Sequence, residues 1–228
     1  MKKVHCRLPA LIGGLLLAGT FGSSPLLADA ILLSLDDSSK DGPTIAHVDL
    51  TAAVNYTHLG PVQPNAVGLV YASDGKVVPC QFVPDPGYDP TKRIAGTFVA
   101  QHDGGPAELK LAVAAPQSQA ANATEAFSGT ITTPSFDIEH KPEAQGGLPS
   151  RIRFTKTGKV FENFRWQDRV HHPDLGGYQF RDDRQATVEK VCDGPICSVV
   201  RVRARCIRGD QQPESQPAAV YDWYYFSD

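Results

Sequence analysis

Three arginines recur at every second position near the C-terminus: Arg201, Arg203 and Arg205. Alternate side chains of a β-strand point to the same face, about 7 Å apart along the strand. A guanidinium group binds planar anions such as carboxylates through two parallel hydrogen bonds. The spacing therefore predicts one of two arrangements. Either the row contacts acidic sugars, or it forms ion pairs with acidic residues of neighbouring strands such as Glu189 or Glu162.

Aromatic side chains that could stack on sugar rings lie in two places. Trp166 stands alone, whereas Val220–Phe226 (VYDWYYF) is the most aromatic segment of the chain. In an extended segment, Tyr221, Trp223 and Tyr225 share one face. Aromatic side chains bury large areas, so one face of this segment must belong to the core. Trp166 and Trp223 are the candidates for carbohydrate contact.

Residues 168–183 (DRVHHPDLGGYQFRDD) contain the densest group of acid and base side chains. His171 or His172 could act as a general base, with Asp174 to orient the imidazole. An exposed polar loop would have the same composition. No nucleophile and no metal-ligand spacing completes a recognised catalytic site, so the catalytic residues stay open and neither a metal nor a cofactor is predicted.

Four cysteines follow the first thirty residues: Cys80, Cys192, Cys197 and Cys206. An even number suits an oxidising compartment. Cys192 and Cys197 flank the turn-forming residues 193–196 (DGPI), which favours a disulfide between them and leaves Cys80 to pair with Cys206. The alternative is a zinc site, but the chain lacks the paired short C-x₂₋₄-C spacing.

Short apolar segments separated by Gly, Pro and Asp predict an all-β, mainly antiparallel fold. Asp-Gly and Gly turns predict three hairpins, and a fourth pair of strands flanks residues 102–106. The segments that form these pairs are 66–71 with 76–83, 93–101 with 107–114, 151–155 with 160–166, and 187–192 with 197–206. A further strand is expected at 44–54, and Pro79 predicts an edge or a bulge in the strand that contains it.

Charge and composition divide the chain into two β regions. Residues 31–150 carry six Lys and Arg against thirteen Asp and Glu, whereas 151–228 carry thirteen against eleven. Residues 139–150 are rich in Pro, Gly and charge. We therefore expect a small N-terminal β domain at 31–138, a linker or long loop at 139–150, and part of a β-sandwich at 151–228.

The first thirty residues have the pattern of a bacterial secretory signal peptide. Basic residues precede the apolar run Leu8–Ala18, and Ala28-Asp-Ala30 follows as a cleavage motif. We expect cleavage near Ala28 or Ala30 and a secreted or periplasmic product. No later segment has the ~20 apolar residues of a membrane helix, so no stable membrane insertion is expected after cleavage. Because the remaining chain is negative and exported, nucleic acid is not an expected partner.

Four segments of the C-terminal region carry a resemblance to a known family. They are Gly158–Phe161 (GKVF), Ala186–Val191 (ATVEKV), Gly194–Ala204 (GPICSVVRVRA) and Tyr221–Phe226 (YDWYYF). The region resembles the sandwich of secreted exo-rhamnogalacturonan-lyase-like proteins and related galactose-mutarotase-like sandwiches. Residues 66–82 look like part of the small β domain that precedes it. Those proteins continue for hundreds of residues, so the resemblance implies a chain that corresponds to the N-terminal part of such an enzyme. It assigns no catalytic residue.

Two functional hypotheses follow from these patterns. The first is a secreted carbohydrate-associated β-sandwich protein that binds acidic polysaccharide, as the N-terminal part of a polysaccharide-lyase-like enzyme. The second is a non-enzymatic exported structural or envelope β-protein whose arginines are paired internally. The patterns leave open whether the chain is an enzyme.

Overall fold

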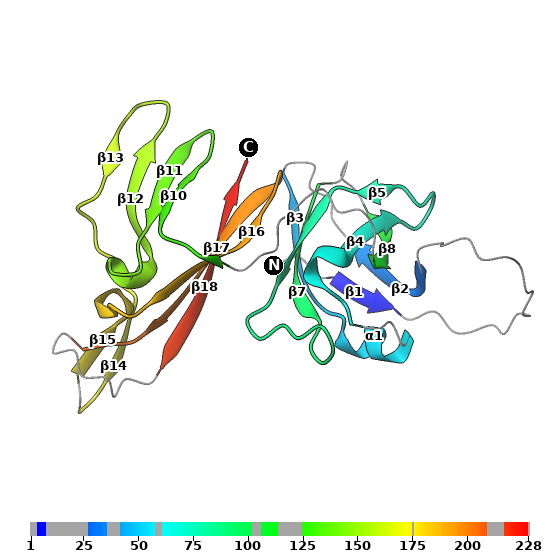
Figure 1. Cartoon of the computed structure of the whole chain (residues 1–228), viewed down its shortest axis with the longest axis horizontal. Coiled ribbons are helices and arrows are strands. Elements are labelled where there is room, and N and C mark those ends of the chain that lie inside the picture. The colour runs from blue at the N-terminus through cyan, green and yellow to red at the C-terminus, as the bar shows by residue number, and fades with distance from the viewer. Residues whose placement is uncertain are drawn as a thin grey trace, which may run out of the picture. The chain divides into compact units, whose positions relative to one another are not determined.

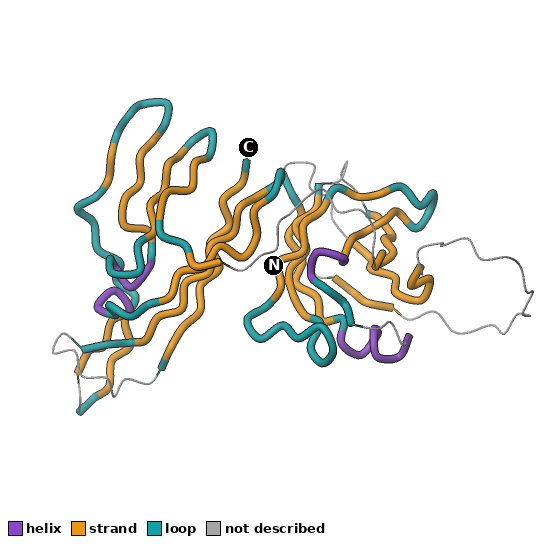
Figure 2. Tube along the Cα trace, viewed as in Figure 1, coloured by secondary structure: helices purple, strands orange, loops and turns teal. Residues whose placement is uncertain are grey.

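A computed structural model describes residues 4–7, 27–35, 42–57, 61–101, 106–113, 125–174, 176–208 and 217–227. These residues form antiparallel β-sheets with little helix, which confirms the predicted all-β class (Figure 2). Most of the predicted signal peptide lies outside the described residues. No helix within the described ranges is long and apolar enough to cross a membrane.

The chain divides into two compact units, residues 1–122 and 123–228. The expected linker 139–150 lies inside the second unit, and the division falls between residues 122 and 123. A segment rich in Pro and Gly is typical of a linker, but these residues pack tightly within the second unit, as described below.

The first unit contains two antiparallel sheets (Figure 1). The five-stranded sheet has the order β1 (Val4–Arg7), β2 (Leu27–Leu35), β8 (Ala107–Val113), β4 (Val67–Tyr71), β5 (Val77–Val78). The three-stranded sheet has the order β3 (Thr44–Asp49), β7 (Ala95–Ala100), β6 (Cys80–Pro84). Strand β3 alternates strictly between buried and exposed residues, as expected for a strand with one face on a core. Phe82 and Phe98 pack in that core with ring centroids 5.0 Å apart.

Two sequence predictions fail in the first unit. Residues 93–101 and 107–114 were expected to pair, but β7 and β8 belong to different sheets. The expected strand 44–54 ends at Asp49, and α1 (Thr51–Thr57) follows. Alanine favours helix, and the Asp49 carboxylate accepts a hydrogen bond from the Thr51 amide at the helix start (2.9 Å). A single-turn element, η1 (Pro64–Ala66), precedes β4.

Pro79 has the effect that its sequence position predicts. It separates β5, an edge strand of the five-stranded sheet, from β6, which pairs with β7 in the other sheet. Proline lacks the amide proton that a continuous ladder needs, so the chain changes sheets at this residue.

The second unit is built from two four-stranded sheets and a hairpin. One sheet has the order β10 (Gly129–Thr132), β11 (Phe136–His140), β12 (Pro149–Phe154), β13 (Val160–Phe161). The other has the order β18 (Ala218–Phe226), β17 (Cys197–Arg205), β16 (Thr187–Asp193), β9 (Glu125–Ala126). The hairpin pairs β14 (Arg169–His172) with β15 (Gly176–Gln179). The predicted hairpins β12–β13 and β16–β17 are confirmed.

The two four-stranded sheets share one hydrophobic core. Its buried members come from β10, β11 and the residue before β12 on one side and from β16, β17 and β18 on the other: Ile131, Ile138, Leu148, Val188, Val200, Val202 and Tyr225. Trp166 and Trp223 pack against this cluster as partly buried side chains. Sheet faces therefore pack on each other as in a β-sandwich.

The connection between β11 and β12 passes through η2 (Gln145–Gly147), which packs tightly within the second unit. Gln145, Gly146 and Gly147 all have positive φ, at 56°, 65° and 79°. A Cβ atom on Gly146 would lie 2.1 Å from the carbonyl oxygen of Phe180, in η3 (Phe180–Asp182). Glycine is required here because the backbones of η2 and η3 approach too closely for any side chain.

Candidate functional site

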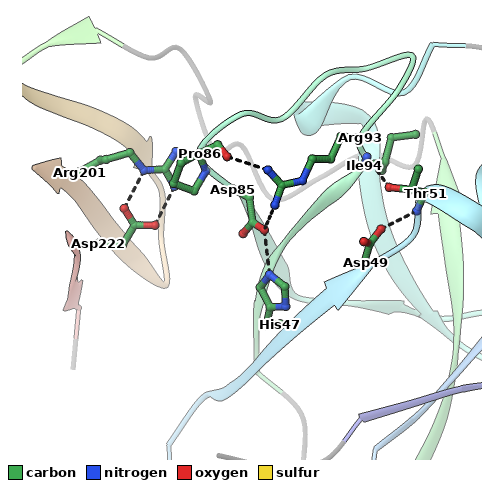
Figure 3. Close-up of polar contacts among 9 residues, drawn as sticks. All are labelled: His47, Asp49, Thr51, Asp85, Pro86, Arg93, Ile94, Arg201 and Asp222. Atoms are coloured by element: carbon green, nitrogen blue, oxygen red, sulfur yellow. Dashed lines mark hydrogen bonds and ion pairs between the residues drawn. The ribbon is translucent and has the colours of Figure 1, made fainter. Parts of the chain in front are cut away.

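Arg201 is held by a two-pronged ion pair with Asp222. Its Nε and Nη2 atoms donate to the two carboxylate oxygens of Asp222, both at 2.7 Å (Figure 3). The register places Arg201 directly opposite Asp222 on β18 and Glu189 on β16. The Arg201 side chain is 4% exposed. Its guanidinium therefore links two neighbouring strands of the sheet. Glu162, an expected partner of the arginine row, pairs instead with Arg151.

The other two arginines of the row are more exposed. Arg203 Nε lies 3.6 Å from the Glu189 carboxylate, a partner that the sequence predicted. Arg205 is exposed, and its backbone amide donates to the buried carboxylate of Asp183 (2.7 Å). The opposite face of β17 carries Val200 and Val202, both fully buried. The apolar face is as predicted, but Val199 and Arg201 on the opposite face are buried too, and ion pairs occupy two of the three guanidinium groups.

The aromatic side chains expected to contact carbohydrate, Trp166 and Trp223, pack together against the core of the second unit. The rings of Trp166 and Trp223 pack edge to face with centroids 5.3 Å apart. Trp166 Nε1 donates to the carbonyl oxygen of Pro149 (2.8 Å). Tyr221 and Tyr225 lie on the same face of β18 and pack in the same cluster. The structure thus assigns the core face of Val220–Phe226 to these rings, and both tryptophans contribute to packing.

A buried histidine that the sequence analysis missed lies beside these rings. His140 is 0% exposed, and its Nδ1 lies 2.8 Å from the carbonyl oxygen of Gly147. A carbonyl oxygen only accepts, so Nδ1 carries the proton and Nε2 accepts from the Tyr225 hydroxyl (2.6 Å). Burial lowers the pKa of His140 and raises the pKa of Tyr225, which keeps both groups neutral. In the sequence, the only indication of this role is that His140 follows Phe136 and Ile138 at every second position, on the apolar face of β11.

The acid and base candidates lie on the β14–β15 hairpin rather than in a loop. His171, His172 and Asp174 are all exposed. His172 Nδ1 accepts a hydrogen bond from the backbone amide of Asp174 (3.2 Å), so it is the Asp174 amide that contacts the ring. Within the described ranges, no group of three or more His, Cys, Asp or Glu is arranged to hold a metal ion.

The predicted disulfides are wrong, because all four cysteines are buried thiols. The register places Cys192 opposite Val199 of β17, and Cys197, the first residue of β17, opposite Phe226 of β18, so the two cysteines do not face each other across the hairpin. Cys80 and Cys206 are likewise thiols. Burial raises the pKa of Cys80 to about 11, and burial together with the neighbouring Cys192 raises the pKa of Cys197 to about 12. High thiol pKa values disfavour the reactive thiolate.

A polar pocket of about 470 Å³ opens in the second unit, between the segment that follows β13 and the turn η3. Seven residues line it: Gln145, Glu162, Asn163, Phe164, Arg165, Arg181 and Asp182. Its size falls within the usual range for ligand sites. Carboxylate, amide and guanidinium groups dominate the lining, with Phe164 as the one aromatic ring.

Gln145 and Arg181 fix the wall of this pocket. The Gln145 amide donates to the carbonyl oxygen of Phe164 (2.5 Å) and accepts from the Trp166 amide (3.4 Å). Arg181 Nη1 donates to the carbonyl oxygen of Trp166 (3.1 Å), and its Nε lies 3.8 Å from Asp182. Gln145 is the one non-glycine residue with positive φ in the described part of the chain. Such backbone conformations concentrate at functional sites.

A second polar group lies in the first unit. His47 Nε2 lies 2.9 Å from Asp85 Oδ2, and Arg93 Nη2 lies 3.7 Å from the same oxygen (Figure 3). Arg93 Nη1 also donates to the carbonyl oxygen of Pro86 (3.1 Å). The His47 side chain is 56% exposed. This group fixes the loop that connects β6 with β7, and no pocket among those described contains it.

Comparison of the chain with protein-family models, with curated proteins and with solved structures gives no match. The resemblance to lyase-like sandwiches stays a prediction from the sequence.

Proposed function

We propose that the chain is an exported carbohydrate-binding β-protein and that the pocket beside Arg165 and Arg181 binds an acidic sugar. One observation carries the proposal. The pocket places two guanidinium groups, two carboxylates, two amide side chains and an aromatic ring around a space of ligand size. Two of the three arginines of the row on β17 are engaged in ion pairs, so the pocket is a better candidate for sugar binding than the row.

The lining chemistry suits a polyhydroxylated ligand. Sugar hydroxyls donate and accept hydrogen bonds, and the pocket offers acceptors on Glu162 and Asp182 together with an amide that does both, on Asn163. Phe164 supplies an apolar ring surface for the C–H face of a sugar. A lining this polar would bind a strongly apolar ligand poorly, because the polar groups would lose their water without replacement.

The two arginines favour a ligand that carries a carboxylate. Arg181 is only 17% exposed in its side chain, and its contact with Asp182 is long. Arg165 is exposed at the pocket rim. Charge-assisted hydrogen bonds from guanidinium to carboxylate are short and about twice as strong as neutral ones. The acidic polysaccharide class implied by the sequence resemblance carries this group on each uronate ring.

The second candidate is a non-enzymatic structural or envelope protein. The Arg201–Asp222 ion pair supports it, because these side chains stabilise the sheet and contact each other. In that case the polar pocket is a solvated surface feature.

Calorimetric titration with oligogalacturonate separates the two candidates. The carbohydrate proposal predicts binding that weakens about tenfold or more in Arg165→Ala, because one charge-assisted pair is lost. Asn163→Ala should weaken binding less, and Arg205→Ala, an exposed arginine outside the pocket, should leave it unchanged. Neutral galactose oligomers should bind more weakly than the acidic ones. Absence of binding to every oligosaccharide would favour the structural candidate.

A further inference from the structure

The tip of the β12–β13 hairpin exposes apolar and basic side chains together. Phe161 is 52% exposed and Val160 is 40% exposed. Lys156 and Lys159 flank the turn and are also exposed. Gly158, at φ 68° with open space around it, closes this turn. Figure 1 shows this turn at one end of the sheet, beside the turn that joins β10 and β11. We call residues 154–161 the hairpin tip.

Each face of the hairpin tip exposes one apolar side chain, but only the face of Phe161 is apolar throughout, because Val160 shares its face with the ion pair of Arg153 and Asp137. The register pairs Phe161 with Ile152 and Val160 with Arg153, so Phe161 and Val160 point to opposite faces of the sheet. On the face of Phe161, three rings follow one another across β11, β12 and β13. Phe136 and Phe154 have centroids 5.0 Å apart, and Phe154 and Phe161 have centroids 5.5 Å apart.

The charge of the hairpin tip is positive. Arg151 pairs with Glu162, and Arg153 pairs with Asp137. Among the described residues, no carboxylate forms an ion pair with Lys156 or Lys159. The two ammonium groups are therefore uncompensated at the end of the hairpin, beside the exposed apolar side chains.

We propose that the hairpin tip docks peripherally on a membrane surface that contains anionic lipid. The exposed Phe161 and Val160 side chains suit contact with the boundary between headgroups and acyl chains. The two lysines lie where they can contact anionic headgroups. This inference is independent of the sugar pocket and involves no spanning segment.

Vesicle sedimentation with the full chain tests this docking. We expect binding to vesicles of phosphatidylcholine and phosphatidylglycerol in equal parts, and much weaker binding to phosphatidylcholine alone. Lys156→Gln with Lys159→Gln should reduce the partition constant roughly 25-fold, since each lysine near an anionic surface contributes a factor of about five. Phe161→Ser and Val160→Ser should each reduce it several-fold, with the larger effect, about tenfold, for Phe161.

The matched control changes an exposed valine and an exposed lysine elsewhere. Val77→Ser with Lys92→Gln lies in the first unit and should leave the partition constant unchanged. Circular dichroism of each variant checks that it is folded. Failure of the native chain to sediment with anionic vesicles would overturn the proposal. Equal losses in the control and tip variants would do the same. So would tip variants that lose oligogalacturonate binding while still sedimenting with vesicles, because the tip would then be a polysaccharide surface.

Discussion

His140 sits among apolar side chains with both ring nitrogens engaged, by the Gly147 carbonyl and the Tyr225 hydroxyl. Protonation would place a charge in the core and would turn the acceptor Nε2 into a donor. Burial accordingly lowers the pKa of His140 in the folded chain. In the unfolded chain the imidazole returns to its ordinary pKa of about 6.5.

We expect the second unit to lose stability as the pH falls below about 6.5. In this window the unfolded chain binds a proton at His140 that the folded chain does not bind, so the free energy of unfolding decreases with falling pH. One such proton contributes at most about 1.4 kcal/mol per pH unit. Urea unfolding between neutral and mildly acidic pH measures the slope.

The matched variants for this measurement are His140→Gln and His171→Gln. The first should flatten the acid slope, although it also lowers stability at every pH. The second changes an exposed histidine and should keep the native slope. Parallel pH profiles for His140→Gln and the native chain would show that another group causes the acid sensitivity.

At the scale of elements, η2 illustrates how close packing selects glycine. Gly146 and Gly158 have nearly the same backbone conformation, with φ values of 65° and 68°. Only Gly146 is crowded, because a Cβ atom there would overlap the Phe180 carbonyl, whereas Gly158 has open space around it. Substituting these two glycines therefore distinguishes the free-energy cost of a positive φ from the additional cost of a steric clash.

We predict that Gly158→Ala lowers the free energy of unfolding by about 1 kcal/mol, the cost of a left-handed conformation for alanine. Gly146→Ala should lower it by clearly more, about 3 kcal/mol or above, because η2 and η3 must separate. Thermal or urea unfolding of the two variants measures the difference. Equal decreases in the free energy of unfolding for the two variants would mean that the close approach of η2 and η3 does not exclude a Cβ atom at Gly146.

The sequence predicted local elements better than long-range pairings. The β12–β13 and β16–β17 hairpins were predictable because a Gly or Asp-Gly turn specifies each within a few residues. Strands β7 and β8 each show a strand pattern, but their partners are chosen by packing of the whole unit, which local patterns do not encode. Similarly, the polar pocket joins Gln145, residues 162–165 and residues 181–182, which only the folded chain brings together.

Side-chain partners followed the same division. Alternation along β17 correctly predicted which face is apolar, and Glu189 was a predicted partner for the row. The pairing of Arg201 with Asp222 needed the β17–β18 register, and the Cys192–Cys197 disulfide failed because the hairpin places Cys192 opposite Val199. Local structure that depends on a few neighbouring residues can therefore be predicted from the sequence, whereas the register between strands depends on the complete sheet.

At the scale of the whole molecule, export would change the first sheet. Cleavage near Ala28 or Ala30 removes β1 and the first part of β2, together with the pairing of Leu27 with Ala112. The pairing of Leu32–Leu35 with β8 is retained, and Leu33 stays in the core. The first unit therefore keeps the edge that covers β8.

We predict that expression in a bacterial host yields a periplasmic or secreted protein whose first residue is Asp29 or Ile31. N-terminal sequencing or intact-mass measurement of the exported fraction identifies the cleavage position. Ala28→Arg with Ala30→Arg should block processing, because signal peptidase requires small residues there. Ala10→Leu, within the apolar run, should still be processed. A chain recovered from the cytoplasm with Met1 in place would contradict export.

The two tryptophans of the chain, Trp166 and Trp223, both pack against the core of the second unit. Intrinsic tryptophan fluorescence is therefore a selective optical probe of residues 123–228, while far-ultraviolet circular dichroism records the strands of both units. If the halves melt separately, the two spectroscopic curves will not coincide, and a single two-state fit would mix two transitions. A fluorescence melt alone would leave the first 122 residues spectroscopically silent.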